Sequence, residues 1–380
     1  MSPTSFIVFA DDWGRHPSSC QHLFRRLIPR HPTFWVNTIG LRRPTFDMAS
    51  VRRALEKLRQ WTRRKSAEAA PLPANLSVSN PRMWPWFSTA LDRAINRFLL
   101  ARHLRRLARR LAAPPVVVTT LPIVADLLPL FRRWRWVYYC VDDFSKWPGV
   151  DGKAMQRMEK LLVERCDRII AVSETLRDKM NRMGREAELL THGVDLELYA
   201  TVPQAPPLPE IATLERPLVV FFGVIDRRMD TAWVQVLAQS LEAGTVLLVG
   251  PQDNPDPVLF QTPRVVVMPP IAYERLPSLV RESAVLIMPY ADLPVTRAMQ
   301  PLKLKEYLAA GRPAVVRDLP ANRPWADCMD MVGSGEAFVA AVRERLRTGL
   351  PPEQGRARQR LRAEGWAEKA QQFERWLLGG

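Results

Sequence analysis

Two neighbouring carboxylates follow a short apolar run near the middle of the chain. Asp142 and Asp143 come directly after the run Trp136–Val141, which has the length and composition of a buried strand. Loops at the carboxyl ends of parallel strands are where α/β proteins bind ligands. A carboxylate there can accept the proton of an attacking hydroxyl, so either aspartate is a candidate general base. The structural alternative is that the first caps the next turn and the second is solvated.

A second polar segment follows the first apolar run of the chain, Phe6–Ala10. Its candidate ligand-binding residues are Asp12, His16, Ser18 and Ser19. A helix is expected from about Cys20, and the amino end of a helix after a parallel strand offers free N–H groups to anions and hydroxyls. Either serine also suits the N-cap of that helix, which is the structural alternative. Neither GxGxxG nor GxxxxGK[ST] occurs in the sequence, which disfavours a nicotinamide or P-loop site.

A helix in the second half of the chain carries a lysine and a glutamate on one side. Lys303 and Glu306 are three residues apart, after Pro301 in the expected first turn and before Gly311, which closes the helix. The lysine and the helix terminus can hold phosphates, while the carboxylate can accept hydrogen bonds from vicinal hydroxyls. A simple ion pair between residues i and i+3 explains the same spacing.

Short apolar runs alternate with charged, helical stretches along the whole chain, which is typical of parallel sheets covered by helices. The expected strands are Phe6–Ala10, Thr33–Asn37, Val116–Thr119, Trp136–Val141, Arg168–Val172, Leu218–Gly223, Thr245–Val249, Val265–Met268, Ala284–Met288 and Ala314–Val316. The expected helices include Lys153–Cys166, Glu174–Met183, Thr231–Leu241, Leu302–Ala310 and Glu336–Arg347. The pattern predicts an α/β fold of two doubly wound domains.

The domain boundary is marked by a proline-rich segment. We expect a first domain over residues 1–200, a spacer over residues 201–215 and a second domain over residues 216–353. The last segment, residues 354–380, has the apolar spacing of a helix. It is either a closing helix of the second domain or a helix that crosses back to the first.

The net positive charge lies almost entirely in the first half of the chain. Residues 1–200 hold 34 basic and 19 acidic side chains, and residues 201–380 hold 21 and 20, so the first half carries +15 of the net +16. In Arg93–Ala113 the apolar residues are expected to share a helical face opposite the arginines; they are Ile95, Phe98, Leu99, Leu104, Leu107 and Leu111. Such a helix can lie on an anionic lipid surface, or it can be a surface helix with a solvated basic face. Nucleic acid is not expected as a partner, because no nucleic-acid-binding motif accompanies the charge.

Four cysteines and five histidines show no disulfide or zinc spacing, so no metal and no disulfide scaffold is expected. No window approaches the roughly 20 apolar residues that cross a bilayer, and the amino terminus lacks the pattern of a signal peptide. We therefore expect a cytoplasmic protein, with any membrane contact peripheral.

Five segments in this order resemble the GT-B glycosyltransferases, specifically the family-4-like branch that includes enzymes of teichuronic acid and exopolysaccharide assembly. They are the DDF segment after Cys140, CDRIIAVSETLRDKM (166–180), THGVDLELY (191–199), FFGVIDRRMD (221–230) and PLKLKEYLAAGRPAVV (301–316). The resemblance implies two Rossmann-like domains with parallel sheets facing a central cleft, the acceptor on the first domain and a nucleotide sugar on the second. It requires no cofactor besides that co-substrate.

The resemblance also implies roles for individual residues. Glu306 would bind the donor ribose, Lys303 the diphosphate and Tyr290 the nucleotide region. The full implied donor set is Gly223, Arg227, Tyr290, Pro301, Leu302, Lys303 and Glu306. Many family-4 enzymes have a second glutamate at the position of Ala298, so the choice between retention and inversion stays open. The usual Gly-Arg pair is Gly223-Val224 here, and Arg227 is a loose substitute.

Three classes of function follow. The first is transfer of a hexose from a nucleotide sugar to a lipid-linked or polysaccharide acceptor, at the inner face of the cell membrane, in surface glycan biosynthesis. The second is a sugar-nucleotide epimerase of the same fold, which has no need of a basic half. The third is a non-enzymatic basic module that binds lipid or nucleic acid, which leaves the Lys303 and Glu306 helix unexplained.

Overall fold

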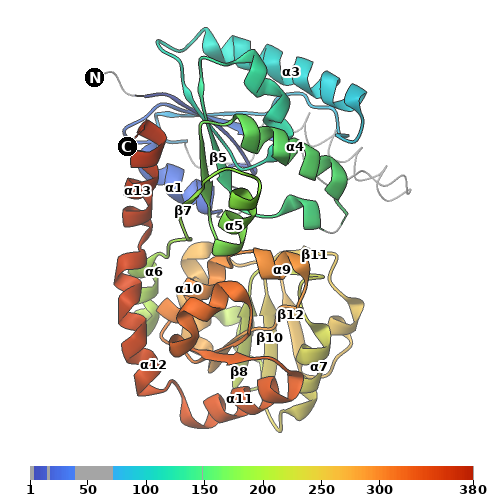
Figure 1. The fold of residues 1–380 in the computed structure, drawn as a ribbon. Coiled ribbons are helices and arrows are strands. Elements are labelled where there is room, and N and C mark those ends of the chain that lie inside the picture. The colour runs from blue at the N-terminus through green and yellow to red at the C-terminus, as the bar shows by residue number, and fades with distance from the viewer. Residues whose placement is uncertain (1–3, 15–17, 39–71, 148, 380) are drawn as a thin grey trace. The chain divides into compact units, whose positions relative to one another are not determined.

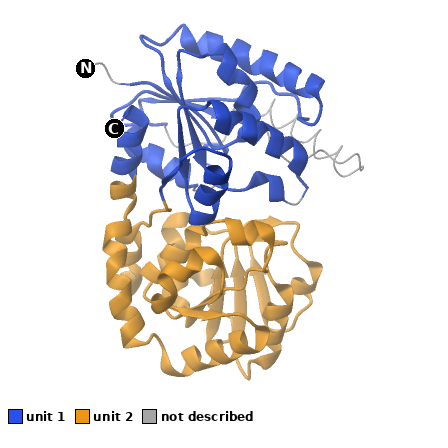
Figure 2. Ribbon diagram, in the orientation of Figure 1, with its two compact units in different colours: residues 1–190, 370–380 blue, residues 191–369 orange. Residues whose placement is uncertain are grey.

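The computed structural model describes residues 4–14, 18–38, 72–147 and 149–379 (Figure 1). The chain divides into two compact units, coloured separately in Figure 2. Unit 1 comprises Met1–Leu190 and Ala370–Gly380, and unit 2 comprises Thr191–Lys369.

In unit 1 the described residues form a parallel sheet with the strand order β3-β2-β1-β4-β5-β6-β7. The strands are β1 Phe6–Ala10, β2 Thr33–Asn37, β3 Leu76–Ser79, β4 Val116–Thr119, β5 Arg135–Cys140, β6 Arg168–Ala171 and β7 Glu188–Leu189. Every residue of β1 is fully buried, as expected for a strand covered on both faces. The carboxyl ends of β1, β4 and β5 therefore lie side by side at one edge of this sheet.

Helices alternate with these strands, and the four described α-helices among them start at polar N-caps. They are α1 Ser19–Leu27, α3 Ala90–Ala108, α4 Gly152–Arg165 and α5 Glu174–Arg182, with the 3₁₀ helices η1 Pro122–Leu130 and η2 Phe144–Lys146. The caps Ser18, Thr89, Asp151 and Ser173 each accept a hydrogen bond from a backbone N–H in the first turn. Thr89 and Asp92 form a full capping box at the start of α3.

In unit 2 the described strands form a second parallel sheet, with the order β12-β10-β8-β13-β14-β15. These strands are β8 Leu218–Phe222, β10 Thr245–Val249, β12 Val265–Met268, β13 Val285–Met288, β14 Ala314–Arg317 and β15 Asp330–Val332. A separate short pair is formed by β9 Ile225–Asp226 and β11 Gln252–Asp253. Strands β8, β10 and β13 are fully buried, so they form the centre of the unit.

The helices of unit 2 alternate with these strands. The α-helices are α6 Leu196–Ala200, α7 Thr231–Ser240, α8 Leu276–Glu282, α9 Pro294–Ala298, α10 Leu302–Ala309, α11 Gly335–Thr348 and α12 Pro352–Ala357. The last helix, α13 Trp366–Leu378, begins in unit 2 and continues in unit 1 from Ala370. The 3₁₀ helices are η3 Val202–Gln204, η4 Pro209–Ile211, η5 Pro257–Phe260, η6 Tyr273–Arg275, η7 Pro320–Cys328 and η8 Arg358–Glu364.

The predicted α/β fold with parallel sheets is confirmed, and each predicted strand is present with its ends moved by at most one residue. The units divide at Leu190 rather than at residue 200. The segment expected to be a spacer, residues 201–215, lies inside unit 2 and contains η3 and η4. Its prolines occupy first-turn positions, which a helical turn tolerates, and Leu208 and Ile211 are buried in the core of unit 2.

The carboxyl-terminal segment is interrupted where one helix was expected. Gly365 has an extended backbone and separates η8 from α13. From Ala370 onward α13 belongs to unit 1, where Phe373 packs edge-on against Phe24 and Glu374 pairs with His31 at 2.7 Å.

The apolar face predicted for the basic helix is wrong in part. Leu104 and Leu107 are buried on the inner side of α3 as expected, but Phe98 is 64% exposed. The buried side is set by Leu100 and Leu104, and Phe98 lies roughly 200° around the helix from Leu100. Phe98 therefore shares the outer side of α3 with Arg102.

Within the part of the chain that the structure describes, no helix combines the length and the apolar character needed to span a membrane.

Candidate functional site

The carboxyl edge of the unit 2 sheet brings two loops together beside α10. The loop after β8 and the loop after β13 run along each other, since Asp230 donates its N–H to the Pro289 carbonyl at 2.8 Å and Ala291 donates to that of Arg228 at 2.7 Å. Neighbouring parallel strands β8 and β13 place both loops at this edge. The edge therefore holds the predicted donor residues from three separate stretches of sequence.

Glu306 is the centre of a hydrogen-bonded cluster on α10. Its Oε2 accepts hydrogen bonds from Lys303 Nζ at 2.9 Å and from the Tyr199 hydroxyl at 3.1 Å. Its Oε1 accepts only a long hydrogen bond among the described residues, from the Tyr273 hydroxyl at 3.5 Å. Glu306 is 5% exposed. One oxygen of the carboxylate is thus held firmly, and the other retains capacity to accept a further donor.

Lys303 lies between the carboxylate and two aromatic faces. Its Nζ is 5.3 Å from the ring centre of Phe222, the last residue of β8, and 5.8 Å from that of Tyr273. These cation–π distances place the ammonium at the carboxyl edge of the sheet. Its side chain is 22% exposed, so the charge remains open to solvent on one side.

Three tyrosines around α10, Tyr199, Tyr273 and Tyr307, were not predicted as site residues. Tyr199 ends the HGVDLELY segment and lies on α6, and its burial and the nearby Glu306 carboxylate hold the pKa of its hydroxyl well above the ordinary value. Tyr307 donates its hydroxyl to the Phe222 carbonyl and accepts from the Phe222 N–H at 2.9 Å. These contacts fasten α10 to the end of β8.

Gly223 and Arg227 have different surroundings in the loop after β8. The Gly223 carbonyl oxygen would lie 1.8 Å from a Cβ at Gly250, so these two loops approach as closely as backbones can. Arg227 is exposed, and no ion pair to it exists within the described ranges. Arg228, by contrast, forms an ion pair with Asp226 at 2.8 Å. Arg227 is therefore the arginine of this loop that can reach a ligand.

The remaining predicted donor residues are more buried. Tyr290 is 6% exposed and its ring packs edge-on against Phe221, and this burial raises the pKa of its hydroxyl. Pro301 is the N-cap residue of α10, and Leu302 is the half-buried first residue of that helix. These three shape the edge of the sheet.

A buried lysine next to Glu306 in the sequence belongs to another cluster of unit 2. Lys305 is 2% exposed in its side chain and pairs with Glu364, which also binds Lys369 at 2.8 Å. Its ammonium also donates to the Thr191 hydroxyl at 3.1 Å. Burial lowers the pKa of Lys305 to about 8. This cluster ties α10 to the beginning and the end of unit 2 and is structural.

In unit 1, Asp142 and Asp143 follow β5 as predicted but have different environments. Asp143 is 1% exposed, and its Oδ1 accepts hydrogen bonds from Lys179 Nζ at 2.8 Å and from the Ser145 hydroxyl at 2.6 Å. Burial alone would raise the pKa of Asp143, but Lys179 and Ser145 outweigh it and hold that pKa below its ordinary value. Lys179 also pairs with the buried Glu159. Asp143 is therefore anchored in a charge network.

Asp142 is partly exposed, and its Oδ1 accepts the Asp143 N–H at 2.9 Å. Asp12 follows β1, and β4 lies between β1 and β5. The strands that lead to Asp12 and to Asp142 are therefore roughly 10 Å apart in the sheet. Ser18 is the N-cap of α1, with its hydroxyl 3.3 Å from the Gln21 nitrogen, and Ser19 is buried. His16 lies outside the described residues.

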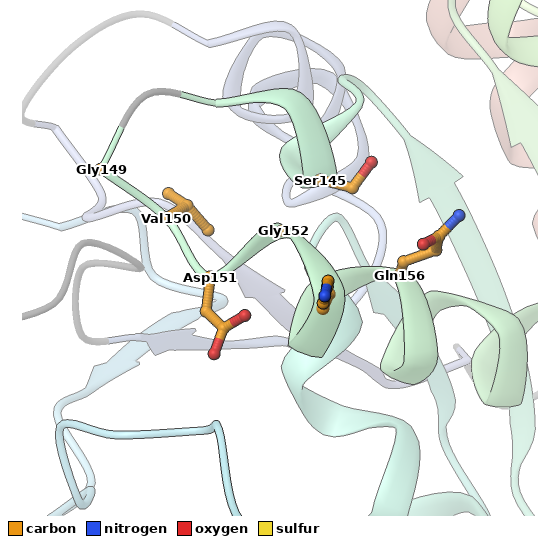
Figure 3. Close-up of a pocket in the computed structure, with 7 residues that line it drawn as sticks. Ser145, Gly149, Val150, Asp151, Gly152 and Gln156 are labelled. Carbon is orange, nitrogen blue, oxygen red and sulfur yellow. The ribbon is translucent and has the colours of Figure 1, made fainter.

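A cavity of about 640 Å³ lies in unit 1, between the loop after β5 and the first turns of α4 (Figure 3). Its lining is mostly polar and consists of Ser145, Gly149, Val150, Asp151, Gly152, Lys153 and Gln156. Gly152 is required here because a Cβ would lie 2.3 Å from the Ser145 carbonyl oxygen. A polar cavity with hydroxyl, amide and ammonium groups suits a ligand rich in hydroxyls.

The four cysteines are free and buried. In the described ranges, no group of three or more histidine, cysteine, aspartate or glutamate side chains is arranged to hold a metal ion.

Comparison with known protein sequences gives two partial matches. A model of the family Glycosyltransferase Family 4 matches residues 59–198. The protein named as teichuronic acid biosynthesis glycosyltransferase TuaH, from Bacillus subtilis, is 32% identical over 178 residues, which is 45% of this chain and 45% of TuaH. The match therefore spans less than half of either protein.

Solved structures match along nearly the whole chain. Sucrose-phosphate synthase from Thermosynechococcus elongatus aligns with a TM-score of 0.71 at 14% identity, covering 98% of both chains. HepE from Anabaena, in complex with UDP-glucose, aligns with a TM-score of 0.68 at 14% identity, covering 99% of this chain and 100% of that chain. This chain has the GT-B fold.

The predicted resemblance to the family-4-like GT-B glycosyltransferases is thereby confirmed. The region that matches the family model includes Asp142 and Asp143, whereas Tyr199, Lys303 and Glu306 lie beyond it. The roles of the donor residues therefore depend on their own geometry.

Proposed function

We propose that this GT-B protein is a glycosyltransferase that moves a hexose from a nucleotide sugar to a lipid-linked or polysaccharide acceptor in surface glycan biosynthesis. The observation that carries the proposal is the pairing of Lys303 with Glu306 at the carboxyl edge of the unit 2 sheet. A cation and a hydrogen-bond-accepting carboxylate, side by side, match the diphosphate and the ribose of a nucleotide sugar.

The donor would be held by charge and by hydrogen bonds. Lys303 and the amino end of α10 would bind the diphosphate, and Arg227 would add a further cation. Glu306 would accept the ribose hydroxyls through Oε1, because Oε2 is already occupied by Lys303 and Tyr199. We propose that these cations stabilise the leaving diphosphate without a metal ion.

The acceptor would bind to unit 1. The cavity beside Ser145 would take a part of the acceptor that is rich in hydroxyls, and Asp12, Ser18 and Ser19 lie on the same unit. Asp142 is the better candidate for a general base, because Asp143 is buried and held in an ion pair with Lys179. Removing a proton from the acceptor hydroxyl would strengthen it as a nucleophile toward the anomeric carbon.

The similar proteins support the choice of substrates. HepE was solved in complexes with UDP and with UDP-glucose, and TuaH carries a name that refers to teichuronic acid biosynthesis. The excess of positive charge in the first 200 residues suits an acceptor carried by an anionic membrane. We accordingly propose a cytoplasmic enzyme that works peripherally at the inner face of the cell membrane.

Calorimetric titration with a panel of nucleotides and nucleotide sugars tests the donor half of the proposal. We expect one nucleoside diphosphate and its sugar conjugate to bind, and unrelated mononucleotides to bind much more weakly. Absence of binding across UDP, GDP, ADP and their sugar conjugates would contradict a nucleotide-sugar function. Conversion of a bound sugar nucleotide into its epimer without any acceptor would instead indicate an epimerase.

A further inference from the structure

The inner side of α3 is fully engaged with unit 1. Leu100, Leu104 and Leu107 are buried against it. Arg93 forms a bidentate ion pair with Asp126 of η1, in which the distance from Nε to Oδ2 is 2.8 Å. These contacts fix which side of the helix faces outward.

The outer side of α3 carries two large apolar residues in its first half. Leu91 is 70% exposed and Phe98 is 64% exposed, although both would be more stable out of water. They are seven residues apart, so they lie on one line along the helix. Figure 1 shows α3 running along the outside of unit 1.

The same line continues as a row of arginines in the second half of the helix. Arg105 is seven residues after Phe98 and continues the line. Arg102 is four residues after Phe98, and Arg109 is four residues after Arg105, so both lie on the same side of the helix. All three are exposed, and within the described residues none has an ion-pair partner. The outer face of α3, defined by Leu91, Phe98, Arg102, Arg105 and Arg109, therefore combines exposed apolar surface with uncompensated positive charge.

We propose that the outer face of α3 docks on the surface of an anionic bilayer. Its apolar half would enter the boundary between headgroups and acyl chains, and its arginines would pair with the lipid phosphates. The proposal rests on the membrane-bound acceptor proposed above and names the surface that would reach it.

Two other occupants fit this face less well. A nucleic acid would use the arginines but would gain little from Leu91 and Phe98, because phosphate backbones are contacted by cations and polar groups. A second copy of this chain would bring two rows of arginines together and would be repelled. An anionic bilayer uses both halves of the face.

Sedimentation with vesicles tests the proposal. Vesicles of phosphatidylglycerol and phosphatidylcholine are compared with vesicles of phosphatidylcholine alone, at low and high salt. We expect the wild-type protein to bind the anionic vesicles at low salt and to be largely released at ~1 M salt, where the screening length shortens to about 3 Å. Binding to the neutral vesicles should be much weaker.

Two sets of substitutions separate the halves of the face. The set Arg102→Gln, Arg105→Gln and Arg109→Gln should weaken binding roughly a hundredfold, because each basic residue near an anionic surface contributes about a fivefold factor. The pair Leu91→Ser and Phe98→Ser keeps every charge and should still weaken binding about tenfold or more.

The matched control removes three cations from other exposed surfaces of unit 1, by Lys160→Gln, Arg165→Gln and Arg182→Gln. It should retain most of the binding, since these residues lie on α4 and α5. All variants should keep the circular dichroism and the nucleotide affinity of the wild type, which separates failure of docking from failure of the donor site.

The proposal is overturned if the wild type ignores anionic vesicles, if it binds neutral vesicles equally, or if the control weakens binding as much as the arginine set. Retained vesicle binding in the Leu91→Ser and Phe98→Ser variant would also overturn it. Tight binding of duplex RNA or DNA that only the arginine set weakens would assign the face to nucleic acid instead.

Discussion

Replacing Glu306 by glutamine tests the donor site with the least change of shape. The substitution removes the negative charge and keeps one oxygen acceptor on α10. In the structure the carboxylate accepts hydrogen bonds from Lys303 at 2.9 Å, Tyr199 at 3.1 Å and Tyr273 at 3.5 Å. If the ribose hydroxyls also bind this carboxylate, Glu306→Gln weakens their hydrogen bonds from charge-assisted to neutral.

The expected magnitude follows from the partners. Turning a charge-assisted hydrogen bond into a neutral one costs about 1–1.5 kcal/mol, so two ribose hydroxyls give about 2–3 kcal/mol, or roughly a thirty- to hundredfold loss of nucleotide affinity. The cost to folding should be smaller, about 1 kcal/mol, because the Lys303 side chain is 22% exposed and the glutamine oxygen still accepts from one of its neighbours. Affinity should therefore fall much more than stability.

Tyr199→Phe is the matched control. It removes a hydroxyl that binds Glu306 and leaves the carboxylate charged. Folding should lose about 1–2 kcal/mol, whereas nucleotide affinity should change by only a few-fold. Calorimetric titration with UDP or the preferred nucleotide, run beside urea unfolding, measures both quantities. Unchanged affinity in Glu306→Gln, or equal losses of affinity in both variants, would refute the role given to this carboxylate.

Two further predictions concern residues outside the donor cluster. Asp142→Asn should lower turnover by ~10²–10⁴-fold with little effect on donor affinity. Asp143→Asn should mainly lower the unfolding free energy, by about 1–3 kcal/mol, because it removes a partner of Lys179. Normal turnover in Asp142→Asn would place the base elsewhere. For Lys305, burial lowers the pKa to about 8 from an ordinary 10.5, so the folded state releases this proton first and stability rises as pH increases through this interval. Between about pH 7 and pH 9.5 the unfolding free energy of the wild type should rise by roughly 2 kcal/mol relative to that of Lys305→Met, as measured by urea unfolding. An equal pH dependence in the two proteins would contradict the lowered pKa of Lys305.

Much of the fold could be predicted because its signals are local. Central strands such as Phe6–Ala10 are continuous apolar runs, and they formed where expected. The edge strand Leu76–Ser79 was missed because its sequence, LSVS, is short and half polar. The apolar face of α3 was predicted wrongly in part, because the chain offers apolar residues around much of the helix. Packing of Leu100 and Leu104 decides which of them are buried.

The candidate site divides in the same way. The pairing of Lys303 with Glu306 depends on helical spacing and could be predicted. The contact of Glu306 with Tyr199 joins residues 107 positions apart, so only the folded chain reveals it. The burial of Asp143 likewise depends on Lys179 from another helix. Sequence spacing identified the candidate carboxylates, and tertiary packing determined that Asp143 is the one held in an ion pair.

A transfer assay tests the central claim most directly. The protein is incubated with a radiolabelled nucleotide sugar of the type that binds, with and without a membrane lipid extract, and both the released nucleoside diphosphate and the lipid-extractable label are measured. A glycosyltransferase with a membrane-bound acceptor should release the diphosphate and label the lipid fraction in equal amounts, only when extract is present, and Glu306→Gln should lower both. Tight binding of the donor with no transfer to lipid or polysaccharide from any source tested would contradict the account.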